Sequence, residues 1–88
     1  MTAEQARILF QYYAKDLGEH GVHPVNEQHP TLAHCAWMCS EAQTFDSLPK
    51  VMRWLGYVQG VLSALGLFTI AELRNHSFHA IAGKEPPA

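Results

Sequence analysis

The segment Met52-Arg-Trp-Leu-Gly-Tyr-Val-Gln-Gly-Val-Leu-Ser-Ala-Leu-Gly66 carries no charged side chain after Arg53. As a helix it is apolar over most of its circumference, which predicts a central helix packed on several sides. Gly56 and Gly60 lie one turn apart on the same side, and each costs about 1 kcal/mol relative to alanine in a helix interior. We therefore expect a neighbouring helix to approach the backbone closely at these two glycines.

The same segment is too short to span a membrane. No charged side chain occurs between Trp54 and Ala71, but Gly66 ends the helix and Thr69 begins another. The helical part therefore falls short of the roughly 20 apolar residues that a bilayer needs. The N-terminus has no basic region followed by an apolar run, so we expect no signal peptide and a cytoplasmic protein.

Local signals predict four helices. Thr2 with Gln5 is a capping box, and apolar residues at helical spacing then continue to Gly18. Thr69 with Glu72 is a second capping box. The chain is predicted to be an all-α, small four-helix bundle-like domain over 1–83, centred on the third helix, with a flexible tail over 84–88. Its helices are expected at about 3–17, 31–43, 48–65 and 70–78.

Composition narrows the function classes. The chain has 88 residues, of which 48% are hydrophobic and only 16% charged. A chain this short buries only about 60–65% of its unfolded surface, so the apolar surplus predicts self-association, most simply as a homodimer. The net charge is −2 and the six lysines and arginines are spread along the chain, which argues against nucleic-acid binding.

Four residues are candidate contacts with a partner. Ile8 and Tyr12 fall on a second face of the first helix, away from its core positions. Trp37 lies off the apolar face of the second helix, and Arg53 opens the central helix. Aromatic and arginine side chains are enriched in binding surfaces. We therefore interpret these four residues as partner-binding. The alternatives are that Ile8 and Tyr12 are simply exposed on the helix, and that a loop covers Trp37.

The strongest metal candidate combines His20, His23, Cys35 and Cys39, a two-cysteine, two-histidine set. Its order and spacing are not those of a common zinc module. The cysteines are four residues apart on the core face of the second helix, where a thiol behaves as a small hydrophobe and is inert. We predict no catalytic residue, no enzyme activity and no cofactor, with structural zinc kept as an alternative.

Two segments, Leu32–Ala42 and more specifically Met52–His76, resemble short uncharacterised proteins encoded by tailed bacteriophages. The shared pattern reads RWLGYVQGVL followed by GLFTIAELRNH. The resemblance brings no assigned activity and no site residues. It implies a small protein made in the cytoplasm of an infected bacterium, where such proteins act mostly by binding. The function expected from it is a protein-interaction module that binds and modulates a host bacterial protein, in host takeover or in blocking host defence.

A second hypothesis belongs to a different class. Aromatic side chains, Arg53, Arg74 and the histidines of the loop at 18–30 are suited to a pocket between protomers. In that case the protein sequesters a nucleotide-like small molecule at an oligomer interface.

Overall fold

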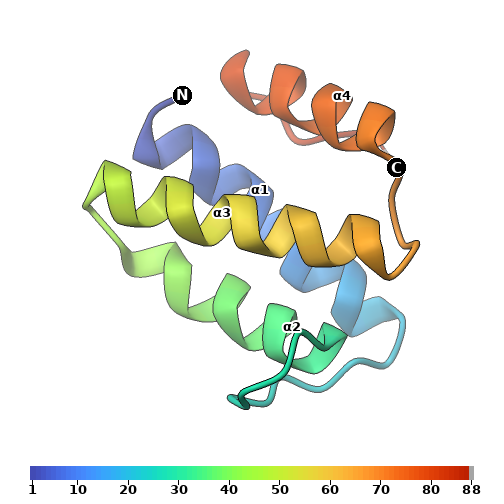
Figure 1. Cartoon of the computed structure of the whole chain (residues 1–88). Coiled ribbons are helices and arrows are strands. Elements are labelled where there is room, and N and C mark those ends of the chain that lie inside the picture. The colour runs from blue at the N-terminus through green and yellow to red at the C-terminus, as the bar shows by residue number, and fades with distance from the viewer. Residues whose placement is uncertain (88) are drawn as a thin grey trace.

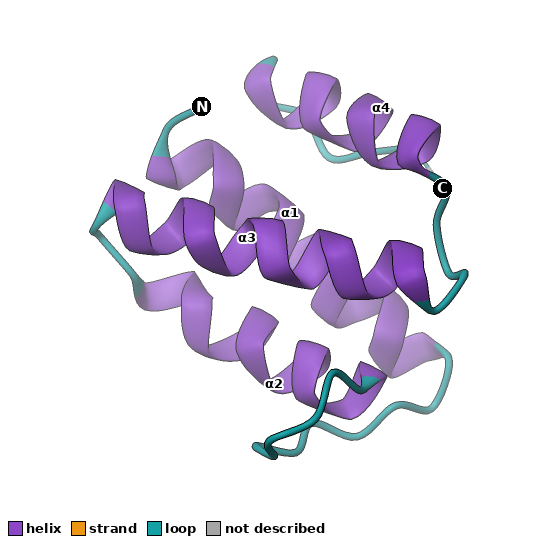
Figure 2. Ribbon diagram, in the orientation of Figure 1, coloured by secondary structure: helices purple, strands orange, loops and turns teal. Residues whose placement is uncertain are grey.

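Four helices form the domain in this computed structural model, which describes residues 1–87 (Figures 1 and 2). They are α1 (Ala3–Glu19), α2 (Leu32–Glu41), α3 (Leu48–Ala64) and α4 (Ile70–Ile81), and the short 3-10 helix η1 (Ala42–Thr44) follows α2. No strand occurs among the described residues, so the predicted all-α fold is confirmed. Within 1–87, no helix combines the length and the apolar character that crossing a membrane requires.

Helix α1 contacts each of the other three helices (Figure 1). Its buried face consists of Ala6, Leu9, Phe10, Tyr13 and Leu17. This is the helical spacing that predicts an amphipathic helix. We expected α3 to be packed on several sides, but α3 buries one face against α1 and α2, made of Val51, Leu55, Val58, Val61 and Leu62.

Gly56 and Gly60 lie on the exposed side of α3. Apart from the neighbouring backbone of α3 itself, a Cβ atom built at either position would meet no described atom within 4 Å. The expectation that another helix of this chain covers these glycines is therefore wrong, because α1 and α2 both pack on the opposite face. Among residues 1–87, no contact at these positions compensates for the low helix propensity of the two glycines.

The ends of two helices differ from the predicted ones. Helix α1 continues through Gly18 to Glu19, because Gly21 rather than Gly18 takes the left-handed conformation, with φ +79°. Helix α4 continues to Ile81, where Gly83, with φ +76°, closes it. Its extra turn is stabilised by a buried alanine, Ala80.

The two capping boxes form as predicted. The Thr2 hydroxyl accepts from the Gln5 backbone N–H at 3.1 Å, and the Gln5 side chain accepts from the Thr2 backbone at 2.8 Å. Thr69 and Glu72 exchange the equivalent bonds at the start of α4. These bonds satisfy N–H groups that the first turn of a helix leaves without partners.

Both irregular segments pack onto the domain. In the long loop before α2, the Glu27 backbone N–H donates to Nδ1 of His34 at 3.2 Å. At the C-terminal end Pro86 is buried, whereas Lys84, Glu85 and Pro87 are exposed, and the flexibility of the tail over 84–88 stays a prediction. The proline ring is apolar and is stabilised by leaving water. The last position of the predicted tail, Ala88, lies outside the described residues.

Replacing Gly56 by alanine should raise the free energy of unfolding by about 0.5–1 kcal/mol, because alanine has the higher helix propensity and its Cβ meets open space. Gly66→Ala is the matched control. Gly66 has φ +77°, so there alanine should destabilise the fold by about 1–2 kcal/mol. Urea unfolding of both variants measures the difference. A Gly56→Ala protein less stable than the wild type would contradict the open position of this glycine.

Candidate functional site

A chain of hydrogen bonds joins three helices inside the core. The Tyr13 hydroxyl of α1 lies 2.9 Å from Nδ1 of His76 on α4, and Nε2 of Gln59 on α3 donates to the same hydroxyl at 3.1 Å. Tyr13 is fully buried and His76 is 5% exposed. Buried polar groups are costly without partners, so this buried polar network holds the three helices in one arrangement.

Burial shifts the pKa of both titratable groups in the network. Desolvation raises the pKa of the Tyr13 hydroxyl above its ordinary value. Desolvation also lowers the pKa of His76 below 6.5, and this effect outweighs the opposing attraction of the Glu72 and Asp16 carboxylates. Both side chains are therefore neutral at neutral pH.

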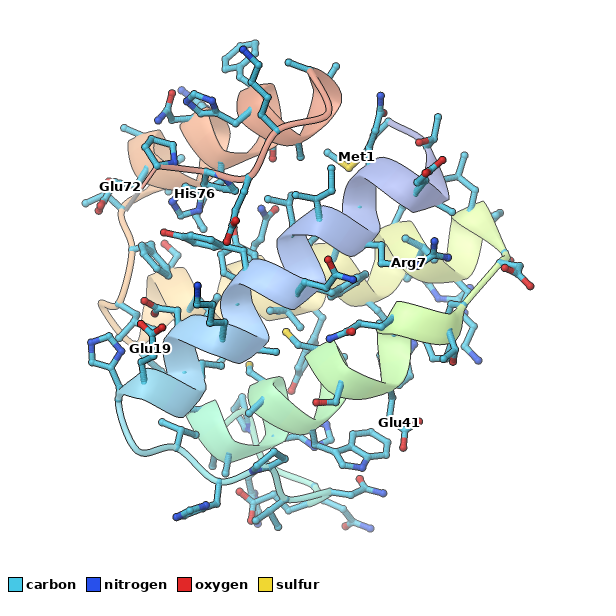
Figure 3. All side chains as sticks on the ribbon, turned by 180° about the vertical axis from the view of Figure 1, so that it is seen from behind. Met1, Arg7, Glu19, Glu41, Glu72 and His76 are labelled. Carbon is cyan, nitrogen blue, oxygen red and sulfur yellow. The ribbon has the colours of Figure 1, made fainter. Side chains whose placement is uncertain are left out.

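A cleft of about 760 Å³ opens beside His76, between α1, α4 and the C-terminal segment. Figure 3 shows His76 directed from α4 toward α1, with Glu72 on α4 and Glu19 on α1 toward the same end of the molecule. The charged residues of its lining are Asp16, Glu19, Glu72, Glu85 and Lys15. Four carboxylates against one ammonium leave a net charge of −3, so half of the chain's eight acidic residues gather here. We call this site the acidic cleft.

Aromatic rings line the cleft next to the imidazole. The ring centroids of Tyr12 and Phe68 lie 5.2 Å and 4.8 Å from that of His76, both edge to face. Partial burial raises the pKa of the Tyr12 hydroxyl, and the four carboxylates of the cleft raise it further. The negative charges of all four carboxylates are therefore close enough to Tyr12 to affect its hydroxyl. Glu72 also accepts the Thr69 backbone N–H at 2.9 Å, a bond that lowers the pKa of its carboxyl.

A second cavity of about 620 Å³ lies between α3 and α4. Three large apolar side chains of α4 line it while remaining mostly exposed: Ile70 (63%), Phe78 (72%) and Ile81 (51%). Helix α3 contributes small residues, including Gly60, and the one charged residue of the lining is Arg74. We call this site the α3/α4 groove.

The predicted partner-binding residues do not form one surface. Tyr12 lines the acidic cleft, while Ile8, one turn earlier on α1, is half-buried and lines neither cavity. Trp37 is half-buried and stacks on His34, with ring centroids 5.5 Å apart. Arg53 is exposed on α3 and lines neither cavity.

The four residues proposed as zinc ligands are not brought together. His20 and His23 are exposed, whereas Cys35 and Cys39 are free thiols fully buried in the core, as the spacing of the cysteines predicts. Burial raises the pKa of the Cys35 thiol to about 11. Across residues 1–87, no group of three or more histidine, cysteine, aspartate or glutamate side chains could hold a metal ion.

His76 and Phe78 are site residues that we did not predict. A signal for His76 is present, because Leu73, His76 and Ala80 recur at helical spacing and all three are buried. A histidine at a buried position of a helix needs a hydrogen-bond partner inside the core, so this spacing predicts one for His76. For Phe78 there is no such signal, because exposure of an apolar residue depends on which helices cover it.

Comparisons of the chain with protein-family models, with curated proteins and with solved structures found no match. The observed structure defines a small all-α, four-helix domain with an acidic cleft and an apolar groove on two sides of α4. Its function is therefore argued from these two surfaces.

Replacing Tyr13 by phenylalanine should lower the free energy of unfolding by about 1–3 kcal/mol, because His76 and Gln59 both lose a buried partner. The matched control is Tyr57→Phe. Tyr57 is 44% exposed, so its change should stay within about 0.5 kcal/mol. Urea unfolding monitored by circular dichroism measures both. Equal effects of the two substitutions would contradict a stabilising role of the network.

Stability should also depend on the protonation of His76. The pKa of this residue is lowered in the folded state, so the unfolded chain takes up the proton first as the pH falls. The free energy of unfolding should decrease as the pH falls through about 6.5, and should level off below the folded-state pKa. In His76→Gln this decrease should be smaller, whereas His79→Gln should retain it. Urea unfolding from about pH 7.5 to about pH 5 measures the profile.

Proposed function

We propose that this protein is a protein-interaction module that binds an apolar helix of a host bacterial protein in the α3/α4 groove. The observation that carries the proposal is the contiguous apolar surface of the groove, with Ile70, Phe78 and Ile81 largely exposed along α4. Single exposed apolar residues are ordinary, but a contiguous patch around a groove is typical of an interaction site.

The glycines of α3 support a helical partner. Gly60 lines the groove, and Gly56 lies one turn away on the same exposed side. Each lowers helix stability by about 1 kcal/mol, and no contact with the described part of the chain offsets this. A partner helix can approach the α3 backbone closely at these positions, where side chains would hold it away.

The groove also favours a particular partner chemistry. A helix bound in a groove uses apolar residues at i, i+3, i+4 and i+7. Arg74, the one charged residue of the lining, favours an acidic side chain on that helix. The resemblance to phage proteins supports the proposal of a target in the bacterial host, and of an action in the cytoplasm of the infected cell, in host takeover or in blocking defence.

Sequestration of a nucleotide is disfavoured by charge. The larger cavity carries a net charge of −3, which repels phosphate groups. Arg53 lines neither cavity, and Arg74 lies in the groove on the other side of α4.

Phe78→Asp should abolish partner binding, with a loss of at least about 2 kcal/mol in binding free energy, because a charge replaces a central apolar contact. The fold should be retained, since Phe78 is 72% exposed. The measurement is affinity capture from bacterial lysate with quantitative mass spectrometry, using tagged wild-type and variant proteins as bait. A photoreactive residue at Ser77, which lines the groove, identifies the segment of the captured protein that enters it.

Val25→Asp is the matched control, because it places the same charge on an exposed apolar residue outside the groove. It should capture the same protein as the wild type. Capture of identical proteins by Phe78→Asp and the wild type would contradict the proposal. Light scattering tests for a second copy in the groove. If the wild type has twice the 9.8 kDa mass of one chain and Phe78→Asp has the mass of a single chain, the groove binds a second copy of this protein and not a host helix.

A further inference from the structure

One nitrogen of His76 faces the acidic cleft without a partner in the described chain. Nδ1 is bonded to Tyr13, and no residue within 1–87 bonds to Nε2. Among these residues no side-chain polar atom is both fully buried and unpaired, so the unpaired Nε2 is not fully buried. His76 lines the acidic cleft, and we infer that Nε2 opens into it. His76 is 95% buried, from its exposure of 5%. A nearly buried imidazole that keeps one ring nitrogen open to a cavity is arranged to bind a ligand.

The buried polar network determines which form of the imidazole faces the cleft. Gln59 donates to the Tyr13 oxygen, and among residues 1–87 the only other side-chain partner of this buried hydroxyl is Nδ1 of His76. The arrangement that leaves no buried proton without an acceptor is therefore the one in which the Tyr13 hydroxyl donates to Nδ1. A neutral imidazole carries one N–H, which must then be at Nε2. His76 therefore presents a hydrogen-bond donor to the cleft.

The charges around this donor select the rest of the ligand. Asp16, Glu19, Glu72 and Glu85 surround a cavity that contains one opposing charge, Lys15. Their negative potential favours a cation, and the aromatic rings that line the cleft offer it a further attractive surface. A volume of about 760 Å³ is in the range of small-molecule sites.

We propose that the acidic cleft binds an organic cation, guanidinium or alkylammonium, that carries a hydrogen-bond acceptor for Nε2–H of His76. The carboxylates at the rim hold the positive group, and His76 at the base binds the acceptor. An arginine residue within a peptide has this chemistry, with its own carbonyl as the acceptor, and so does a free amine of similar size. This site is independent of the α3/α4 groove.

The test measures binding of N-acetyl-L-arginine amide to the full chain by calorimetry. N-acetyl-L-citrulline amide, which has nearly the same shape but no charge, should bind at least about tenfold more weakly. In nitrogen-15 spectra the Nε2–H signal of His76 should shift with the arginine probe. Free L-arginine separates the two sources of ligand. Its carboxylate weakens binding if the cleft recognises an arginine within a chain, whereas equal binding indicates a free small molecule.

Variants locate the site. Glu19→Gln and Glu85→Gln should each weaken binding of the arginine probe about two- to fivefold, because each removes one carboxylate of the cleft. Glu41→Gln makes the same charge change on an exposed residue of α2 outside the cleft, and should leave binding unchanged.

Three results would overturn the proposal. They are equal binding of the arginine and citrulline probes, an equal effect of Glu41→Gln and Glu85→Gln, and no binding of either probe up to about 10 mM. Phe78→Asp should bind the arginine probe like the wild type, because Phe78 lines the groove and not the cleft. Failure of the cation site and failure of the groove are therefore distinguishable.

Discussion

The hydrogen bond between Tyr13 and His76 connects α4 to α1, and both candidate surfaces depend on where α4 lies. The two residues are 63 positions apart in the chain and both are buried, so leaving either without its partner is costly. Gln59 extends the same network to α3. The position of α4 is thus set by a polar contact as well as by the burial of Leu73 and Ala80.

Helix α4 presents different chemistry to its two sides. Glu72 and His76 are four residues apart and line the acidic cleft, whereas Arg74 and Phe78, also four apart, line the α3/α4 groove. This follows from the helical period, which places residues four apart on one side and residues two apart on nearly opposite sides. The same helix therefore lines a charged site and an apolar site, and no charged residue lines both.

The exposed face of α3 makes the domain less stable than it could be, because it carries two glycines. A domain of this size has a small free energy of unfolding, and two exposed helical glycines that the rest of the described chain does not cover reduce it further. Sites that function in binding are commonly less stable than the same fold with a better-packed surface. The glycines and the exposed Phe78 are consistent with such a compromise. Gly60 and Phe78 line the groove of the proposed interface, and Gly56 lies one turn away on the same exposed side of α3.

The sequence by itself determined the four helices, both capping boxes and the core faces of α1 and α2, since these depend on spacing and on contacts a few residues apart. It also indicated Tyr12 as a binding residue, but it did not predict the acidic cleft that Tyr12 lines. Only the tertiary structure decided that α1 contacts every other helix, that Gly60 faces an open groove, and that His76 is buried against Tyr13. Amphipathic helices can pack in several arrangements with the same local signals, and the choice among them is made by contacts between residues far apart in the chain.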